Sequence, residues 1–113
     1  MSQSVLDEKK IFLIATGEDK NLKRYSKIAG AAFPGSVIYT ANDGFEALFK
    51  LENAPPQVLL VDLEVPKLDA IKLTTEVFLR QPNIQTSVVI VSPIPDQEHF
   101  VDKVLSGQVQ FLS

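Results

Sequence analysis

Five short apolar runs, separated by longer amphipathic stretches, constrain the fold of this chain more than any other feature of its sequence. Turn residues bound each run. Strands of a buried parallel sheet are almost continuously apolar, so these runs predict strands. The five predicted strands cover residues 11–15, 37–40, 58–61, 87–91 and 109–112.

The amphipathic stretches predict helices at residues 22–33, 45–51, 71–79 and 100–105. In the first stretch, apolar residues recur at helical spacing. Three aspartates precede helical stretches as N-cap residues do, because an aspartate oxygen can accept hydrogen bonds from the free amides of the first turn. These are Asp43, Asp69 and Asp96.

The strict alternation of strand and helix predicts a doubly wound α/β fold with five parallel strands and helices on both faces. The length of 113 residues suits one domain. We expect residues 1–8 to form a flexible tail and residues 9–113 to form the domain. In such folds the functional crevice lies at the carboxyl ends of the strands.

Composition narrows the classes of function. The net charge of −3 does not suggest nucleic-acid binding, which favours a basic surface. The apolar runs are far shorter than the roughly 20 residues of a membrane-spanning helix. There are no cysteines to form disulfides or thiolate metal sites. These features, with a polar start to the chain, fit a cytoplasmic protein.

Asp62 is the strongest candidate for chemistry, because the apolar run 58–61 leads directly to it. A carboxylate at the end of a strand can bind a hard cation through oxygen, and it can also attack a phosphoryl group. From the local sequence alone, the alternative that Asp62 is a simple turn residue stays open.

The surrounding motifs resemble those of response-regulator receiver domains. Residues 56–69 are similar to the third strand of that family, which ends in the phosphorylated aspartate, and residues 65–70 resemble the Met-Pro-x-Met-Asp-Gly segment that follows it. Residues 40–48 resemble the start of the family's second helix. Ser92, at the end of the fourth strand, lies at the family's usual spacing from Asp62.

The resemblance implies a flavodoxin-like sheet with strand order 2-1-3-4-5 and a role in two-component phosphorelay signalling. Asp62 would accept a phosphoryl group from a sensor histidine kinase or phosphotransfer protein. Ser92 would contact the phosphoryl oxygens, and Phe111 would be the switch aromatic. Mg²⁺ would bind near Glu18 and Asp62, with the backbone carbonyl of Glu64 as a further ligand. An output domain or protein would receive the signal.

Three departures from the family pattern weaken this expectation. The acidic pair that holds magnesium falls on Gly17 and Glu18 when counted without gaps, or near Ala15 and Thr16 when placed by the apolar run. The family's lysine would lie just after Ser113. Two prolines in Pro93-Ile94-Pro95 stiffen the loop after Ser92. We therefore expect magnesium binding to be weak or absent.

Three functions remain open. The first is a working receiver with Asp62 as phosphoacceptor. The second is a pseudo-receiver that serves as a phosphorylation-independent interaction or dimerisation module. The third is a flavodoxin-like enzyme or nucleotide-binding domain, although no Gly-rich phosphate loop is visible. We favour the first two, neither of which is an enzyme.

The predicted sheet lacks a fifth helix after its last strand. We therefore expect the face of strands three to five that carries the first helix to be partly bare. Exposed apolar patches of this kind are rare in monomers, so the sequence predicts a homodimer through this face or a covering by residues 1–8.

Overall fold

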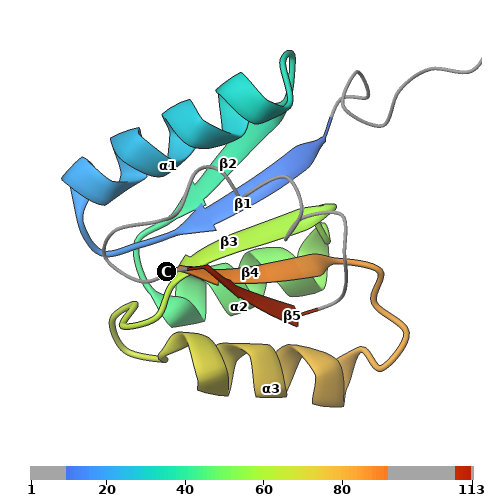
Figure 1. The fold of residues 1–113 in the computed structure, drawn as a ribbon. Helices are drawn as coiled ribbons and strands as arrows, with labels where there is room; N and C mark the ends of the chain where they lie inside the picture. Colours follow the sequence, from blue (N-terminus) through green and yellow to red (C-terminus); the bar gives the residue numbers. More distant parts are fainter. Residues whose placement is uncertain (1–9, 92–108, 113) are drawn as a thin grey trace, which may run out of the picture.

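The computed structural model describes residues 10–91 and 109–112, which form one twisted parallel sheet with helices on both faces (Figure 1). The strand order is β2-β1-β3-β4-β5, as the receiver resemblance implied. The elements along the chain are β1 (Ile11–Ala15), α1 (Asp19–Ala32), β2 (Val37–Ala41), α2 (Gly44–Asn53), β3 (Val58–Asp62), α3 (Ala70–Arg80), β4 (Ser87–Val91) and β5 (Val109–Leu112).

The predicted tail at 1–8, the predicted helix at 100–105 and the predicted cap Asp96 lie outside the described residues. All five predicted strands and three of the four predicted helices are confirmed. Strand ends differ from the predicted ones by at most one residue, and helix ends by one to three residues.

The two faces of the sheet bury separate apolar clusters, because successive side chains of a strand point to opposite faces. On one face Phe12, Ile14 and Leu60 pack with Tyr25 and Phe33 of the α1 segment. On the other face, α2 and α3 cover a cluster that includes Leu13, Leu59 and Val61. β1 and β3 lie inside the sheet and contribute to both clusters.

Aspartate caps start two of the helices, as predicted. Asp43 accepts a hydrogen bond from the Glu46 amide at 2.8 Å, and Asp69 accepts one from the Lys72 amide at 2.9 Å. α1 has no such cap and begins at Asp19, earlier than the predicted residue 22. The apolar pattern could not locate this start, because the first turn of α1 is polar.

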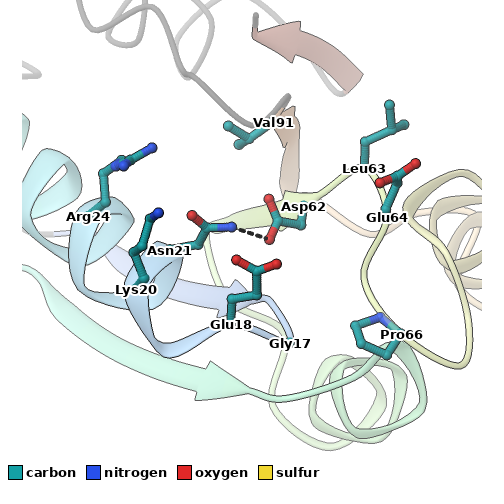
Figure 2. A pocket seen from close by; sticks show the side chains of 10 residues that line it. All are labelled: Gly17, Glu18, Lys20, Asn21, Arg24, Asp62, Leu63, Glu64, Pro66 and Val91. Carbon is teal, nitrogen blue, oxygen red and sulfur yellow. Dashed lines mark hydrogen bonds between the residues drawn. The ribbon is translucent and has the colours of Figure 1, made fainter.

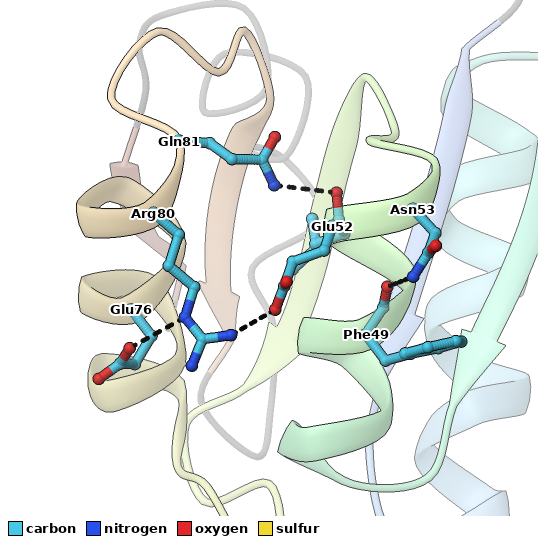
Figure 3. Close-up of polar contacts among 7 residues, drawn as sticks. Phe49, Glu52, Asn53, Glu76, Arg80 and Gln81 are labelled. Atoms are coloured by element: carbon cyan, nitrogen blue, oxygen red, sulfur yellow. Dashed lines mark hydrogen bonds and ion pairs between the residues drawn. The ribbon is translucent and has the colours of Figure 1, made fainter.

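The neighbouring helices α2 and α3 are joined by polar contacts at their carboxyl ends (Figure 3). The Arg80 guanidinium pairs with Glu52 of α2 at 2.5 Å and with Glu76 of its own helix at 3.3 Å. The Gln81 amide donates to the Leu51 carbonyl. The ion pairs are largely exposed, so each contributes little to stability.

The prediction of a bare sheet face is wrong. The side chains of Leu60, Val89, Val91 and Leu112, which point to the α1 side, are all buried. Residues 1–8, the predicted alternative covering, lie outside the described residues. The homodimer through this face stays a prediction.

Among residues 10–91 and 109–112, no helix has the length and apolar character that crossing a bilayer requires.

Candidate functional site

Asp62 ends β3, the central strand, and lies in a cavity of about 590 Å³ at the carboxyl edge of the sheet (Figure 2). The segment between β1 and α1 forms one wall and the loop after β3 forms another. The lining residues are Gly17, Glu18, Lys20, Asn21, Arg24, Asp62, Leu63, Glu64, Pro66 and Val91. This is the edge at which doubly wound sheets place their functional crevice.

Three side chains donate hydrogen bonds to the Asp62 carboxylate. The Tyr25 hydroxyl donates to Oδ1 at 2.5 Å. The Thr16 hydroxyl donates to Oδ2, and the Asn21 amide donates to the same oxygen at 3.3 Å. The Thr16 oxygen in turn accepts from the Glu18 amide at 3.3 Å. Both oxygens of Asp62 therefore already have donors.

Burial and the neighbouring carboxylate change the acidity of Tyr25. The whole residue is buried in the α1-side cluster. Its pKa is raised first by burial, then by the hydrogen bond to Asp62 and by the negative charge of Asp62, while Arg24 opposes the shift. The Tyr25 hydroxyl is therefore a firmly protonated donor at neutral pH.

Close contacts around Pro66 fix the three loops of this edge to one another. A Cβ atom added to Gly17 would lie 2.5 Å from Cγ of Pro66. The Gly44 amide, at the start of α2, donates to the Pro66 carbonyl at 2.9 Å. The next residue, Lys67, has φ of 71°, in the left-handed region, and pairs with Asp43 at 3.4 Å.

Comparison with known proteins gives no matching family model, but several relatives match part of the chain. The uncharacterised transcriptional regulatory protein YhcZ of Bacillus subtilis is 30% identical over 71 residues, 63% of this chain and 32% of its own length. The alkaline phosphatase synthesis transcriptional regulatory protein PhoP of the same species is 37% identical, covering 63% of this chain and 28% of its own length. A protein-glutamate methylesterase/protein-glutamine glutaminase of Nitrosospira multiformis is 41% identical over 61 residues, 54% of this chain and 16% of its own length.

Two solved structures match more than nine-tenths of this chain. The receiver domain of Francisella response regulator 1452 superimposes with a TM-score of 0.61 at 28% identity, covering 91% of this chain and 84% of that one. The chain belongs to the response-regulator receiver domains. A receiver-protein domain from Methanoculleus marisnigri, with a TM-score of 0.68 at 14% identity and coverage of 94% and 86%, shares the fold. This receiver domain spans less than a third of the length of the three curated relatives.

The sheet register shows which residue at the end of β1 lies beside Asp62. Ala15 pairs with Val61, so Thr16 follows β1 where Asp62 ends β3. Of the two placements of the acidic pair given above, the one near Ala15 and Thr16 lies beside Asp62 in this register. At Gly17, a side chain would collide with the ring of Pro66. In this receiver domain, a hydroxyl stands beside Asp62 where the resemblance implied an acid.

The predicted site residues fall in different places. Glu18 and Glu64 line the same cavity as Asp62. Phe111 lies on β5 opposite Ile90 and is 57% exposed. Ser92 lies outside the described residues. Thr16 was named only as a position near which the acidic pair would fall. Asn21 and Tyr25 were not predicted, although their four-residue spacing places both on one side of a helix that starts beside β1.

The side chains around Asp62 do not fit a magnesium site. Magnesium needs several oxygen ligands in octahedral geometry, usually with carboxylates among them. Among the residues that the structure describes, no three His, Cys, Asp or Glu side chains converge. The Thr16 and Tyr25 hydroxyls donate hydrogen bonds to Asp62, and a cation bound to the carboxylate would have to displace them.

Proposed function

We propose that this chain is the receiver part of a response regulator, with Asp62 as its phosphoacceptor. The observation that supports this role is the position of Asp62 at the end of the central strand, inside the cavity at the carboxyl edge of a receiver fold. A sensor histidine kinase or phosphotransfer protein would supply the phosphoryl group. An output domain or partner protein in the cytoplasm would respond to it.

The transfer itself needs an oxygen of Asp62 to form a bond to phosphorus as the bond to the donor's leaving group breaks. The product carries about −1.5 to −2 charge. Lys20 and Arg24 of α1 line the cavity and supply positive charge near it. We propose that magnesium contributes weakly or not at all, and that the domain is an acceptor and not itself an enzyme.

A direct test is incubation with acetyl phosphate, with and without Mg²⁺, followed by intact-mass measurement. The expected result is the addition of one phosphoryl group to the wild type and none to Asp62→Asn. The same test should show little dependence on Mg²⁺. Absence of any added phosphoryl group on the wild-type protein would refute the acceptor role.

A second candidate function is a pseudo-receiver that binds partners without phosphorylation. The observation that favours it is the hydrogen-bonded state of Asp62, both oxygens of which already accept from side chains. For this function, Asp62→Asn should leave partner binding unchanged, whereas a phosphorylation-dependent receiver should lose its response to the donor.

A further inference from the structure

The three donors to Asp62 all come from one continuous segment, residues 16–25, which leaves β1 and enters α1. Asp62 itself belongs to β3. The hydrogen bonds therefore connect the β1–α1 segment, on one face of the sheet, to the central strand. Figure 2 shows the one from Asn21.

We propose that the hydroxyls of Thr16 and Tyr25 hold the Asp62 carboxylate in place of a metal ion. Tyr25 is then a positioning residue that links α1 to Asp62. We call these two hydrogen bonds the tie. This inference deepens the proposed function and rests on it only for the phosphoryl-transfer step. The tie itself is a property of the folded, unmodified chain.

Burial gives the tie its strength. Thr16 and Tyr25 are both almost fully buried, and no buried side-chain N or O atom among the described residues lacks a hydrogen-bond partner. Hydrogen bonds to an ionised carboxylate are stronger than those between neutral groups. Removing the acceptor would leave two buried hydroxyls unsatisfied, which costs more than the bond itself contributes.

The tie also opposes phosphoryl transfer. An oxygen of Asp62 must release its donor before it can form a bond to phosphorus. In the acyl phosphate, that oxygen no longer carries carboxylate charge and is a weaker acceptor. Phosphorylation would therefore loosen the contact between α1 and β3, and the loss of the Tyr25 hydroxyl would make the carboxylate easier to phosphorylate.

The test of the tie is a double-mutant cycle in urea unfolding, with Tyr25→Phe and Asp62→Ala. In the wild type, Tyr25→Phe should raise the unfolded-to-folded ratio about tenfold, as expected for a lost hydrogen bond to a charged group. In the Asp62→Ala background, it should leave that ratio unchanged or lower it, because the hydroxyl there has lost its charged acceptor. The same effect in both backgrounds would overturn the proposal.

Tyr39→Phe is the matched control, because Tyr39 is exposed on β2 and should give no coupling with Asp62. Thr16→Val should repeat the Tyr25 result in the same cycle. If Asp62→Ala does not fold, Asp62→Asn takes its place in the cycle. Tyr25→Phe should then destabilise the Asp62→Asn protein less than the wild type, because the acceptor no longer carries a charge.

The acetyl phosphate assay separates the two proposals. Tyr25→Phe should accept the phosphoryl group several-fold faster than the wild type, and Tyr39→Phe should react at the wild-type rate. A slower reaction of Tyr25→Phe would overturn the opposing role of Tyr25. If no variant is phosphorylated but the cycle shows coupling, the acceptor role fails and the tie stands.

Discussion

At the scale of single residues, the site is defined by what surrounds Asp62. A carboxylate beside other carboxylates attracts a cation, whereas the charge of a carboxylate beside hydroxyls is already stabilised by their hydrogen bonds. Thr16 and Tyr25 place this receiver domain in the second situation. One substitution at Thr16 should move it toward the first.

Thr16→Asp should create a response to magnesium. It would set a second carboxylate beside Asp62, with Glu18 lining the same cavity. Without Mg²⁺ we expect a loss of roughly 1 to 3 kcal/mol of stability, because a hydrogen bond to a charge is replaced by repulsion. Saturating Mg²⁺ should then stabilise the variant by about 2.7 kcal/mol at a hundredfold excess over Kd.

Thermal unfolding at increasing Mg²⁺ measures this response. Thr16→Asn, which has a similar size but no charge, should show no shift. An unchanged melting temperature of Thr16→Asp across the titration would mean that the acidic pair alone does not determine metal binding here.

The raised pKa of Tyr25 predicts a loss of stability in alkali. In the unfolded chain, the hydroxyl ionises near pH 10, but in the folded chain it keeps its proton to higher pH. Its stabilising contribution is therefore complete below about pH 10 and decreases as pH rises toward the folded pKa. The wild type should lose up to about 1.4 kcal/mol per pH unit more than Tyr25→Phe in this range.

Urea unfolding at a series of pH values above 9 would measure the difference between these two proteins. Tyr39→Phe should follow the wild type, since its tyrosine is exposed. Parallel curves for wild type and Tyr25→Phe would show that Tyr25 ionises at similar pH in both states.

At the scale of elements, the site depends on how closely the start of α2 approaches the loop after β3. A Cβ atom at Gly44 would lie on the backbone oxygen of Leu68, well inside contact distance. Glycine is needed here because of the neighbouring backbone, and the same approach allows the Gly44 amide to donate to Pro66.

Gly44→Ala should therefore destabilise the domain by about 1 to 3 kcal/mol or more, as forced shifts in packed regions do. The matched control is Gly30→Ala in α1, where an added Cβ meets nothing within 4 Å. That change should stabilise by about 0.5 to 1 kcal/mol, because alanine favours helix more than glycine does. Equal effects at the two positions in urea unfolding would contradict this explanation.

The sequence predicted these elements well because their signals are local. Asp43 and Asp69 were identified as caps from position alone, and the hydrogen bonds to the amides of Glu46 and Lys72 confirm both. The hydroxyl donors to Asp62 could not be predicted in the same way. Tyr25 has the spacing of a core residue and is one, and only the packing of α1 on the sheet brings its hydroxyl to β3.

At the scale of the whole molecule, the sheet separates two apolar clusters that share the central strands. The sequence predicted a partly bare α1-side surface of β3–β5, whereas the side chains described there are buried. The prediction of a bare face rested on the number of predicted helices. Solvent exposure depends instead on how the complete chain packs, which a list of elements does not specify.

Leu60→Ala should measure how much the α1-side cluster contributes to stability. Leu60 lies on the central strand and is buried, so its truncation should cost about 2 to 5 kcal/mol. Leu79→Ala, at a residue of α3 that is 72% exposed, should change stability by about 0.5 kcal/mol or less. Chemical denaturation of both variants would test this contrast, and similar losses would mean that this cluster is poorly packed.

The position of β3 between β1 and β4 has a consequence for how the chain acquires its structure during synthesis. Until residue 62 has left the ribosome, β1 can pair only with β2, and its other edge stays open. Such edges invite pairing with other chains. Thr16 and Tyr25 also have no carboxylate to bind at that stage. Assembly of the nascent domain therefore waits for a contact 46 residues away in sequence, which favours slow, cooperative folding over stepwise growth from the N-terminus.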